Sequence, residues 1–318
     1  MTAFLGWCGQ RARWFLIGGL LVGAFARPVA ETFLPIVGMA IGGLLFLACF
    51  RTGPSAITGG GNDLRNTVLT ALCLQIAVPL MVLWLGLALG VPEEFLAPII
   101  LLLAASSVTV VPHFLAIMGM ETSHAVRLLL LGTLVLPITA WIVFSSATAL
   151  GLAAYGDPDT IFSSTVRLLG VIAVAAGTAF ALRFFAVPKL NETISHWVEG
   201  WAAILLAVVV IGLMAPIGSA LTERPIALAS TMVAAFAVNL TLQLSAWGVS
   251  GRLSSDRAKR ATLAAVNGNR NFGLFLAALP MSVMEPMLLF IACYQVPNYL
   301  TPFIFQRLYA GGPVSTTS

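Results

Sequence analysis

Charged residues are scarce in this chain of 318 residues, and their scarcity excludes a soluble globular protein. Asp, Glu, Lys and Arg make up 9% of the residues, whereas 59% are hydrophobic. An average soluble domain has about 25% charged residues. A soluble domain of this length needs more polar surface than 16 basic and 12 acidic residues supply. Disorder is excluded as well, because disordered chains are polar and rich in charge.

Several motifs are also missing, and each absence removes a function class. The sequence has no GxxxxGK[ST] loop, and no paired carboxylates, HExxH motif or His-rich cluster appear on one predicted membrane face. We therefore expect neither an enzyme nor an ATP-driven pump, and we expect no metal or cofactor. The net charge of +4 does not indicate nucleic acid, because basic residues in a membrane protein mark cytoplasmic loops. The four cysteines form no CxxC pair and are interpreted as small apolar side chains.

Long continuous apolar runs dominate what remains, and the mean hydropathy is +0.99. A β-barrel is disfavoured because its strands would alternate apolar and polar residues. A membrane-spanning helix needs about 17 to 25 apolar residues. The sequence predicts an all-α polytopic protein of the lipid bilayer with ten spans, which run Trp14–Val29, Phe33–Phe50, Val68–Leu89, Phe95–Met120, Ala125–Ala154, Val166–Ala186, Trp197–Met214, Ile226–Val249, Ala261–Leu279 and Val283–Phe305.

The basic residues predict the orientation of these spans. With ten spans, both termini lie on one side, and twelve of the 16 Lys and Arg residues fall on that side. Only Arg27 and Arg224 fall clearly on the other side, where the loops carry Asp157 and Asp159. Because cytoplasmic loops are enriched in Lys and Arg, both termini are predicted to be cytoplasmic.

The stretch Tyr155-Gly-Asp-Pro-Asp divides the apolar pattern into two halves of five spans each. Since five is odd, the second half enters the membrane in the opposite orientation to the first. Two halves of opposite orientation are expected of an inverted repeat, which is a common architecture of transporters. Residues 1–154 are predicted to form the first repeat and residues 155–310 the second. The tail, residues 311–318, is expected to be disordered.

The ninth predicted span contains three asparagines, two glycines and an arginine in its middle. Glycine and asparagine both disfavour helix, so Asn267 to Gly273 is predicted to be unwound. Arg270 lies near the midplane of the bilayer, where an arginine costs at least about 2.5–3.5 kcal/mol unless it is paired or wet. Two interpretations remain open. The guanidinium is either an anion site in a cavity or a brace on backbone carbonyls of the other broken helix.

The fourth predicted span is the other polar one. Ser106 and Ser107 lie at its middle, Thr109 follows, and Pro112 removes a helix hydrogen bond. These hydroxyls either line a cavity or bond their own helix carbonyls, which is their commoner fate in membrane helices. His113 is a weak candidate for proton coupling, because an imidazole titrates near neutral pH, although a packed histidine is more common.

Three segments resemble the bile acid:sodium symporter family, whose members have ten helices of which two are broken and crossed. Gln75-Ile-Ala-Val-Pro79 resembles the third-helix Gln…Pro pattern of the family. The stretch from Arg260 to Asn271 resembles its ninth-helix signature, an Arg-Thr run that leads to Glu-x-Gly-x-Gln-Asn. Asn239 lies where the family often has His-Asn.

The departures from the family concern its sodium ligands. Aligned on Gly268 and Asn271, the sodium-binding glutamate falls on Val266 and the glutamine falls on Arg270. The Ser-Asn of the fourth helix is not preserved within Ala105 to Val111, and the fifth-helix ligands fall near His124 and Leu128. A hard cation needs oxygen ligands and negative charge, so the resemblance implies a member in which a fixed guanidinium replaces bound sodium.

The resemblance implies a secondary transporter that moves a small organic anion by alternating access. We expect it in a bacterial inner (plasma) membrane, and the sequence leaves its oligomeric state open. The alternatives are a non-transporting membrane sensor or binding protein with the same fold, and a proton-coupled exporter. The candidate substrate-binding residues are Arg270, Asn267, Asn269, Asn271, Ser106, Ser107, Thr109 and Gln75, assisted by half-helix N-termini.

Overall fold

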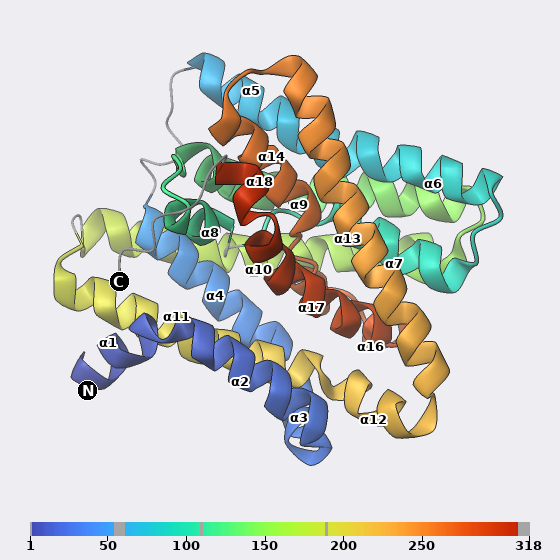
Figure 1. Cartoon of the computed structure of the whole chain (residues 1–318), viewed down its shortest axis with the longest axis horizontal. Coiled ribbons are helices and arrows are strands. Elements are labelled where there is room, and N and C mark those ends of the chain that lie inside the picture. The colour runs from blue at the N-terminus through green and yellow to red at the C-terminus, as the bar shows by residue number, and fades with distance from the viewer. Residues whose placement is uncertain (1, 54–60, 109–110, 188–189, 311–318) are drawn as a thin grey trace. The chain divides into compact units, whose positions relative to one another are not determined.

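The computed structural model describes residues 2–53, 61–108, 111–187 and 190–310 (Figure 1). Over these ranges the chain is all-α, as predicted, and its one β feature is an isolated bridge. The chain forms two compact units, each built from three segments. Unit 1 comprises Met1–Ser55, Tyr155–Ala229 and Gly273–Cys293, and unit 2 comprises Ala56–Ala154, Ser230–Phe272 and Tyr294–Ser318. Each unit therefore takes segments from both predicted halves, 1–154 and 155–310. The predicted disordered tail lies outside the described residues.

Six helices in the described ranges are long and apolar enough to cross a membrane. They expose large apolar side chains, among them Met39, Trp84, Ile138 and Val233, which suits a surface that faces lipid. The protein is thus an all-α membrane protein. The six helices run Arg27–Thr52, Asp63–Ala88, Ser123–Ala149, Pro158–Phe185, Glu192–Glu223 and Pro225–Leu253.

The first and fifth predicted spans end well before their predicted last residues, and the sixth begins earlier than predicted, at Pro158 of α10 (Pro158–Phe185). The first was expected to reach Val29, but α2 (Ala12–Phe25) stops before Pro28, which occupies the first turn of α3 (Arg27–Phe33). A proline is tolerated there because the first N–H groups of a helix have no partner in the helix. The fifth was expected to reach Ala154, but α9 (Ser123–Ala149) ends earlier. Gly151 follows with a φ of +95°, a left-handed conformation that favours glycine after a helix end.

The fourth, ninth and tenth predicted spans are each divided. The fourth consists of α7 (Glu93–Ala104) and α8 (Val111–Ile117), so the helix stops before Pro112 rather than at it. The ninth consists of α14 (Arg257–Gly268) and α15 (Gly273–Leu276). Its unwound stretch lies inside the one predicted, but the helix continues through Asn267 and Gly268. The tenth is built from α16 (Met281–Met284), the 3-10 turn η5 (Glu285–Met287) and α17 (Leu288–Ile304).

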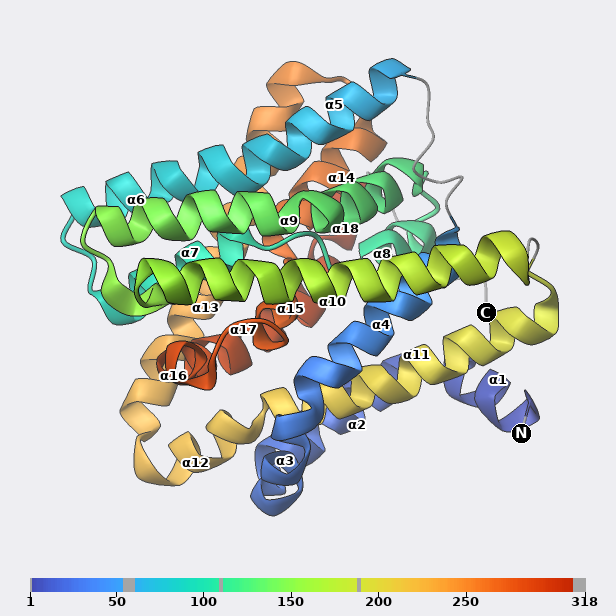
Figure 2. The same ribbon diagram turned by 180° about the vertical axis from the view of Figure 1, so that it is seen from behind.

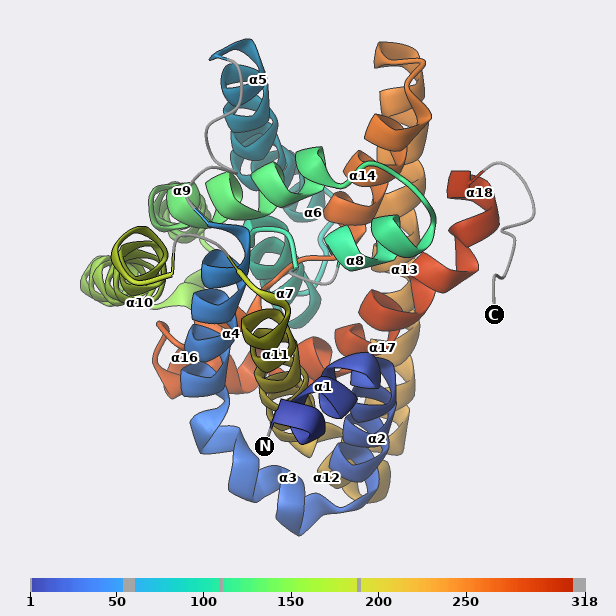
Figure 3. The ribbon, with the colours of Figure 1, turned by 90° about the vertical axis from the view of Figure 1, so that its left-hand side faces the viewer.

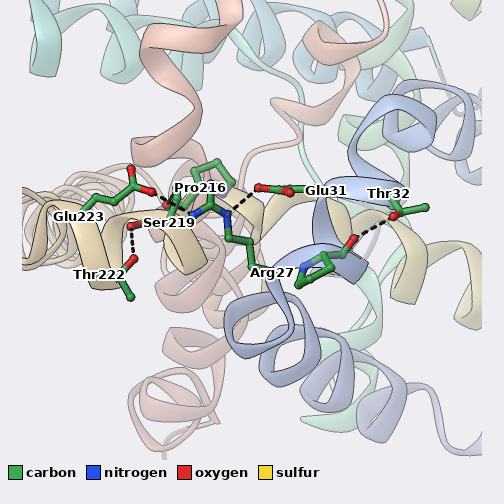
Figure 4. Close-up of polar contacts among 8 residues, drawn as sticks. Arg27, Glu31, Thr32, Pro216, Ser219, Thr222 and Glu223 are labelled. Atoms are coloured by element: carbon green, nitrogen blue, oxygen red, sulfur yellow. Dashed lines mark hydrogen bonds and ion pairs between the residues drawn. The ribbon is translucent and has the colours of Figure 1, made fainter.

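Unit 1 is organised around α11 (Glu192–Leu213), which packs against α1 (Thr2–Gln10), α2 and α4 (Val37–Thr52) (Figure 1). It also contains the short helix η1 (Leu34–Ile36), α10 (Pro158–Phe185) and α12 (Ala215–Glu223). Figure 4 shows Arg27 of α3 between Glu31 and Glu223, to which it donates hydrogen bonds of 2.7 and 2.9 Å. All three side chains are about half-exposed, so this cluster joins α3 to α12 without forming a buried site.

Unit 2 contains both polar interruptions. Its longest helix pair is α9 beside the continuous run of α5 (Gly61–Leu72), the π-helix η3 (Cys73–Ala77) and α6 (Val78–Ala88), as Figure 2 shows. Most of α13 (Pro225–Leu253), α14, most of α17 and the final short helix α18 (Gln306–Ala310) complete the unit. The helix η4 (Ala153–Tyr155) connects α9 to α10.

The hydrophobic core of unit 2 surrounds α14. Small residues of α14, such as Ala261, Ala264 and Ala265, let α8 pack closely against it (Figure 3). Leu115 of α8 and Leu128 of α9 lie in the same cluster. Close packing of small residues is the usual basis of helix association in membranes. The core therefore holds α14 as far as Val266, close to the end of the helix at Gly268.

Candidate functional site

The two interruptions of unit 2 pair with each other. Ser107 and Arg270 form an antiparallel β-bridge. The N–H of Val108 donates to the carbonyl of Asn269 at 3.1 Å, and the N–H of Asn271 donates to the carbonyl of Ser106 at 2.7 Å. Each interruption thus supplies backbone partners to the other, which satisfies groups that would be costly to leave unpaired in a membrane. Two distant parts of the sequence meet at one place.

Arg270 is 1% exposed, and its guanidinium spans this junction. Nε donates to the carbonyl of Asn267 at 3.1 Å and Nη1 to the carbonyl of Ala105 at 3.1 Å. Nη2 donates to Asn267 Oδ1 at 2.7 Å and makes a long contact of 3.4 Å with the carbonyl of Leu74. A guanidinium has five N–H groups, so four of them are directed at neutral oxygens of three chain segments.

Local structure explains why each of these carbonyls is free to accept. Ala105 caps the C-terminus of α7, and Asn267 is in the last turn of α14, where helix carbonyls lack intrahelical donors. The Leu74 carbonyl is freed by the π-helix. The N–H of Val78 bonds to Cys73 instead, and the next candidate donor would be Pro79, which has no N–H. The Gln75…Pro79 pattern therefore creates an acceptor for Arg270.

The charge of Arg270 is balanced by helix ends rather than by a carboxylate. The C-termini of α7 and α14 meet at the guanidinium, and each helix C-terminus carries roughly half a negative charge. None of the ion pairs found among the described residues includes Arg270. These contacts are the ones that the brace interpretation requires. Direct contact between Arg270 and a substrate stays a prediction.

Two predicted site residues hold the guanidinium and its surroundings in place. Asn267 receives Arg270 on Oδ1 and donates from Nδ2 to the carbonyl of Leu242 at 2.9 Å, so its amide orientation is fixed. Gln75 is 2% exposed, donates from Nε2 to the carbonyl of Gly132 at 3.1 Å, and accepts from Thr139 at 2.9 Å. Gln75 thus ties the π-helix to α9 by both ends of its amide.

The remaining asparagines and serines differ in their surroundings. Asn269 is fully buried, donates from Nδ2 to the carbonyl of Ala265 at 2.7 Å, and has a buried Oδ1 without a hydrogen-bond partner. Asn271 is partly exposed. Ser106 accepts a bond of 3.1 Å from the hydroxyl of Thr133, and Ser107 makes a long contact with the Val108 carbonyl. The structure therefore brings the three asparagines, both serines, Arg270 and Gln75 into unit 2.

The surroundings of two predicted site residues lie outside what the structure describes. Thr109 lies outside the described residues, and the side chain of His113 is not among the described side chains. The proton-coupling role of His113 and the binding role of Thr109 remain predictions.

The site contains apolar side chains where a cation site would need acidic ones. Val266 is 2% exposed and belongs to the apolar cluster around α14 together with Ala71 and Leu128. No group of three or more His, Cys, Asp or Glu side chains that could hold a metal ion occurs in the described part of the chain. The cation present at the junction is the Arg270 side chain itself.

A second polar cluster, next to the first, includes residues that sequence reasoning did not assign to the site. The carbonyl of Gly268, the last residue of α14, accepts from Asn239 Nδ2 at 2.7 Å and from the Tyr294 hydroxyl at 2.8 Å. Asn239 and Gln243 were not among the candidate substrate-binding residues. Their spacing of four residues, which puts both on one face of α13, was the signal for a shared target.

A scan against protein-family models and a search of curated proteins find no match to this chain. The resemblance to the bile acid:sodium symporter family stays a prediction.

Proposed function

We propose that this protein is a secondary transporter that moves a small organic anion across a membrane by alternating access. Six helices suited to a bilayer and two helix interruptions that pair with each other inside one compact unit support this proposal. The proposal includes ten spans in two inverted repeats, both termini in the cytoplasm and a bacterial inner membrane. Interrupted helices at membrane depth are typical of transporter binding sites, because irregular backbone is tolerated there only where it is buried in protein or lines a cavity.

We further propose that transport does not need sodium, because Arg270 supplies a permanent cation. The observation that carries this step is the set of carbonyl oxygens around the guanidinium, from Ala105, Asn267 and Leu74. Backbone carbonyls are also the ligands that hard cations take from proteins. A guanidinium that is covalently attached satisfies these oxygens at any sodium concentration, so the junction keeps its shape without a bound ion.

The fixed charge also suggests the substrate class. Arg270 brings one positive charge into an apolar region, and its four hydrogen bonds use neutral oxygens. The helix ends that face this charge are dipoles without a net charge of their own, so the region keeps one positive charge that would attract an anion. Asn271 is partly exposed, and its side-chain NH₂ group is the donor that would orient such an anion once the unit opens.

Flux into proteoliposomes tests the proposal. Purified protein is reconstituted and tested for uptake of labelled carboxylic acids, with sodium replaced by choline at constant ionic strength. We expect uptake that changes less than about threefold, or roughly 0.7 kcal/mol, on removal of sodium. A tenfold loss would show that a sodium site exists elsewhere. Uptake that follows an imposed pH gradient would support the proton-coupled exporter. Saturable binding of an acid without flux would support the sensor.

Substitutions of Arg270 separate substrate contact from bracing. If Arg270 touches the anion, Arg270→Lys should weaken binding by about 10- to 150-fold, because a charge-assisted hydrogen bond is worth roughly 1.5–3 kcal/mol and an ammonium cannot reproduce the planar fork. If Arg270 is only a brace, folded yield falls in Arg270→Lys and Arg270→Gln, and the protein that folds binds normally. Size-exclusion profiles and affinity measured on the same samples decide.

A further inference from the structure

A continuous chain of buried hydrogen bonds connects the end of α14 to the last helix, α18. Asn239 and Tyr294 both donate to the carbonyl of Gly268. Gln243 Nε2 donates to Asn239 Oδ1 at 2.7 Å, and the hydroxyl of Tyr309 donates to Gln243 Oε1 at 2.7 Å. Asn239, Gln243 and Tyr309 are all fully buried. The chain begins one residue before the interruption that carries Arg270.

The direction of each bond in this chain is determined by the one before it. Asn239 must present its NH₂ group to a carbonyl, so its oxygen faces Gln243. Gln243 then presents its NH₂ group to that oxygen, and its own oxygen faces Tyr309. Only a donor can satisfy this last acceptor, and the Tyr309 hydroxyl is that donor. A buried network is stabilising when every member is satisfied, and removal of one member leaves a costly unpaired group.

The helix α18 is also attached to the beginning of α14. Arg257, the first residue of α14, donates from Nε to the carbonyl of Tyr309 at 2.8 Å and from Nη2 to that of Leu308 at 2.7 Å. The Tyr309 ring lies 5.4 Å from that of Trp247 on α13. A helix of five residues is not stable by itself, so α18 owes its structure to these contacts. It is held to both ends of α14, at Arg257 directly and at Gly268 through Gln243.

We propose that Tyr309, Gln243 and Asn239 are positioning residues, through which α18 fixes the end of α14 and with it the unwound segment of Asn269 to Phe272. The network fixes the carbonyl of Gly268, and the two residues that follow provide the Asn269 carbonyl and the Arg270 guanidinium of the junction. The meaning of this link for transport rests on the proposed function. The link itself concerns local order and is measured without a substrate.

Hydrogen exchange of the full chain in lipid nanodiscs tests the link. The reporters are the amides of Val108 and Asn271, which cross between the interruptions. Tyr309→Phe removes one hydroxyl and keeps the ring against Trp247. We expect both amides to exchange at least tenfold faster in this variant, because the opening of the junction becomes easier. Arg307→Gln, at an exposed position on the same helix, is the matched control and should leave both rates within twofold of the parent.

A double-variant cycle distinguishes positioning through Gln243 from general loosening by a damaged C-terminus. In a Gln243→Met background, Tyr309→Phe should add less than a twofold effect, since its partner is already gone. An additional effect as large as in the parent would overturn the assignment, and so would unchanged exchange at Asn271 in Tyr309→Phe alone. If Gln243→Met fails to fold, the Tyr309→Phe result decides. If the parent protein shows no flux, the transporter proposal is contradicted, but the hydrogen-exchange test of the Tyr309 network is unaffected.

Discussion

A single buried arginine is tolerated in unit 2 because its partners are backbone carbonyls rather than an acid. Burial of a charge is costly unless hydrogen bonds replace the water that it loses. Arg270 replaces that water with four oxygens, and those of Ala105, Asn267 and Leu74 are available only because helices end or bulge there. The residue and the interruptions therefore depend on each other. An arginine in an uninterrupted span would find no such acceptors.

Introducing a carboxylate at the junction should create a need for sodium. In Val266→Glu/Arg270→Gln, a carboxylate joins the carbonyls that Arg270 leaves vacant, and oxygen ligands with a negative charge suit a hard cation. We expect sodium to raise the apparent unfolding temperature of this double variant and to leave that of the parent unchanged. Thermal unfolding in sodium and in choline measures this.

Arg270→Gln alone serves as the control, because it vacates the carbonyls without adding charge, and it should gain little from sodium. If the double variant folds and is indifferent to sodium, Val266 does not face the oxygens that hold the guanidinium.

Gly268 is required because Gln243 packs directly against it. A Cβ at this position would lie 2.2 Å from Gln243 Cγ, and hydrogen bonds hold the amide of Gln243 in place. We expect Gly268→Ala to lower the free energy of unfolding by about 1–3 kcal/mol, the usual effect of overpacking. Denaturant unfolding in detergent measures it.

Gly248→Ala is the matched control for this prediction. Gly248 is an exposed position within α13, and a Cβ there would meet no atom within 4 Å. This variant should gain roughly 0.5–1 kcal/mol, because alanine favours helix over glycine. Equal losses in both variants would contradict the packing argument.

At the scale of elements, the sequence predicts where helices are interrupted better than it predicts which contacts satisfy the backbone groups at the interruptions. Clustered Asn and Gly marked the interruption before α15, because these residues disfavour helix whatever surrounds them. Pro112 marked the fourth span as weakened without giving the position of the break, which precedes the proline, because Pro112 sits in the first turn of α8. The π-helix before Pro79 and the pairing of Ser107 with Arg270 depend on tertiary contacts, which local patterns do not contain.

The sequence predicted some residues of the candidate site and missed others. Arg270 and Asn267 were found because polar residues at membrane depth are rare and demand partners. The sequence left open whether those partners belong to a substrate or to the protein. Tyr294, in the middle of the tenth predicted span, and Tyr309, beyond its end, were not found, since tyrosines in and near apolar spans are common and only the fold aims their hydroxyls at buried acceptors.

The N-cap of α10 should make this helix sensitive to acid. The pKa of Asp157 is lowered by a side-chain hydrogen bond from Thr160 and by the N–H of Thr160, which lies 2.8 Å from Asp157 Oδ1. A lowered pKa means that the cap stabilises the protein above the ordinary value of about 3.9 and is lost as the pH falls through the folded value. Asp157→Asn retains an acceptor but does not titrate.

We therefore expect the unfolding temperature of the parent to fall further than that of Asp157→Asn when the pH is lowered from about 6 to about 3. Thr160→Val, which removes the hydroxyl but not the N–H, should fall between the two. Parallel pH profiles for all three proteins would show that the cap does not contribute to stability.

At the scale of the whole molecule, the described residues contain six helical runs long and apolar enough to cross a membrane, together with several shorter, divided helices. Hydropathy alone does not show which spans are divided, because the fourth span, which the structure divides into α7 and α8, was predicted from the sequence as one span. The count of ten spans depends on whether each divided pair crosses the bilayer as one unit. Polar backbone inside a membrane requires internal partners, and the paired interruptions provide them.

The predicted orientation follows from this count and is open to a direct test. If ten spans are present, the loop before α10 is external and both termini are cytoplasmic, as the distribution of Lys and Arg favours. Single cysteines at Asp159 and Ser318, in a background without the four native cysteines, should react with a membrane-impermeant maleimide from opposite sides. Asp159 is chosen because Asp157 caps α10 and should stay intact. Reaction of both positions from the same side would require an even number of crossings between them, whereas the predicted sixth to tenth spans make five.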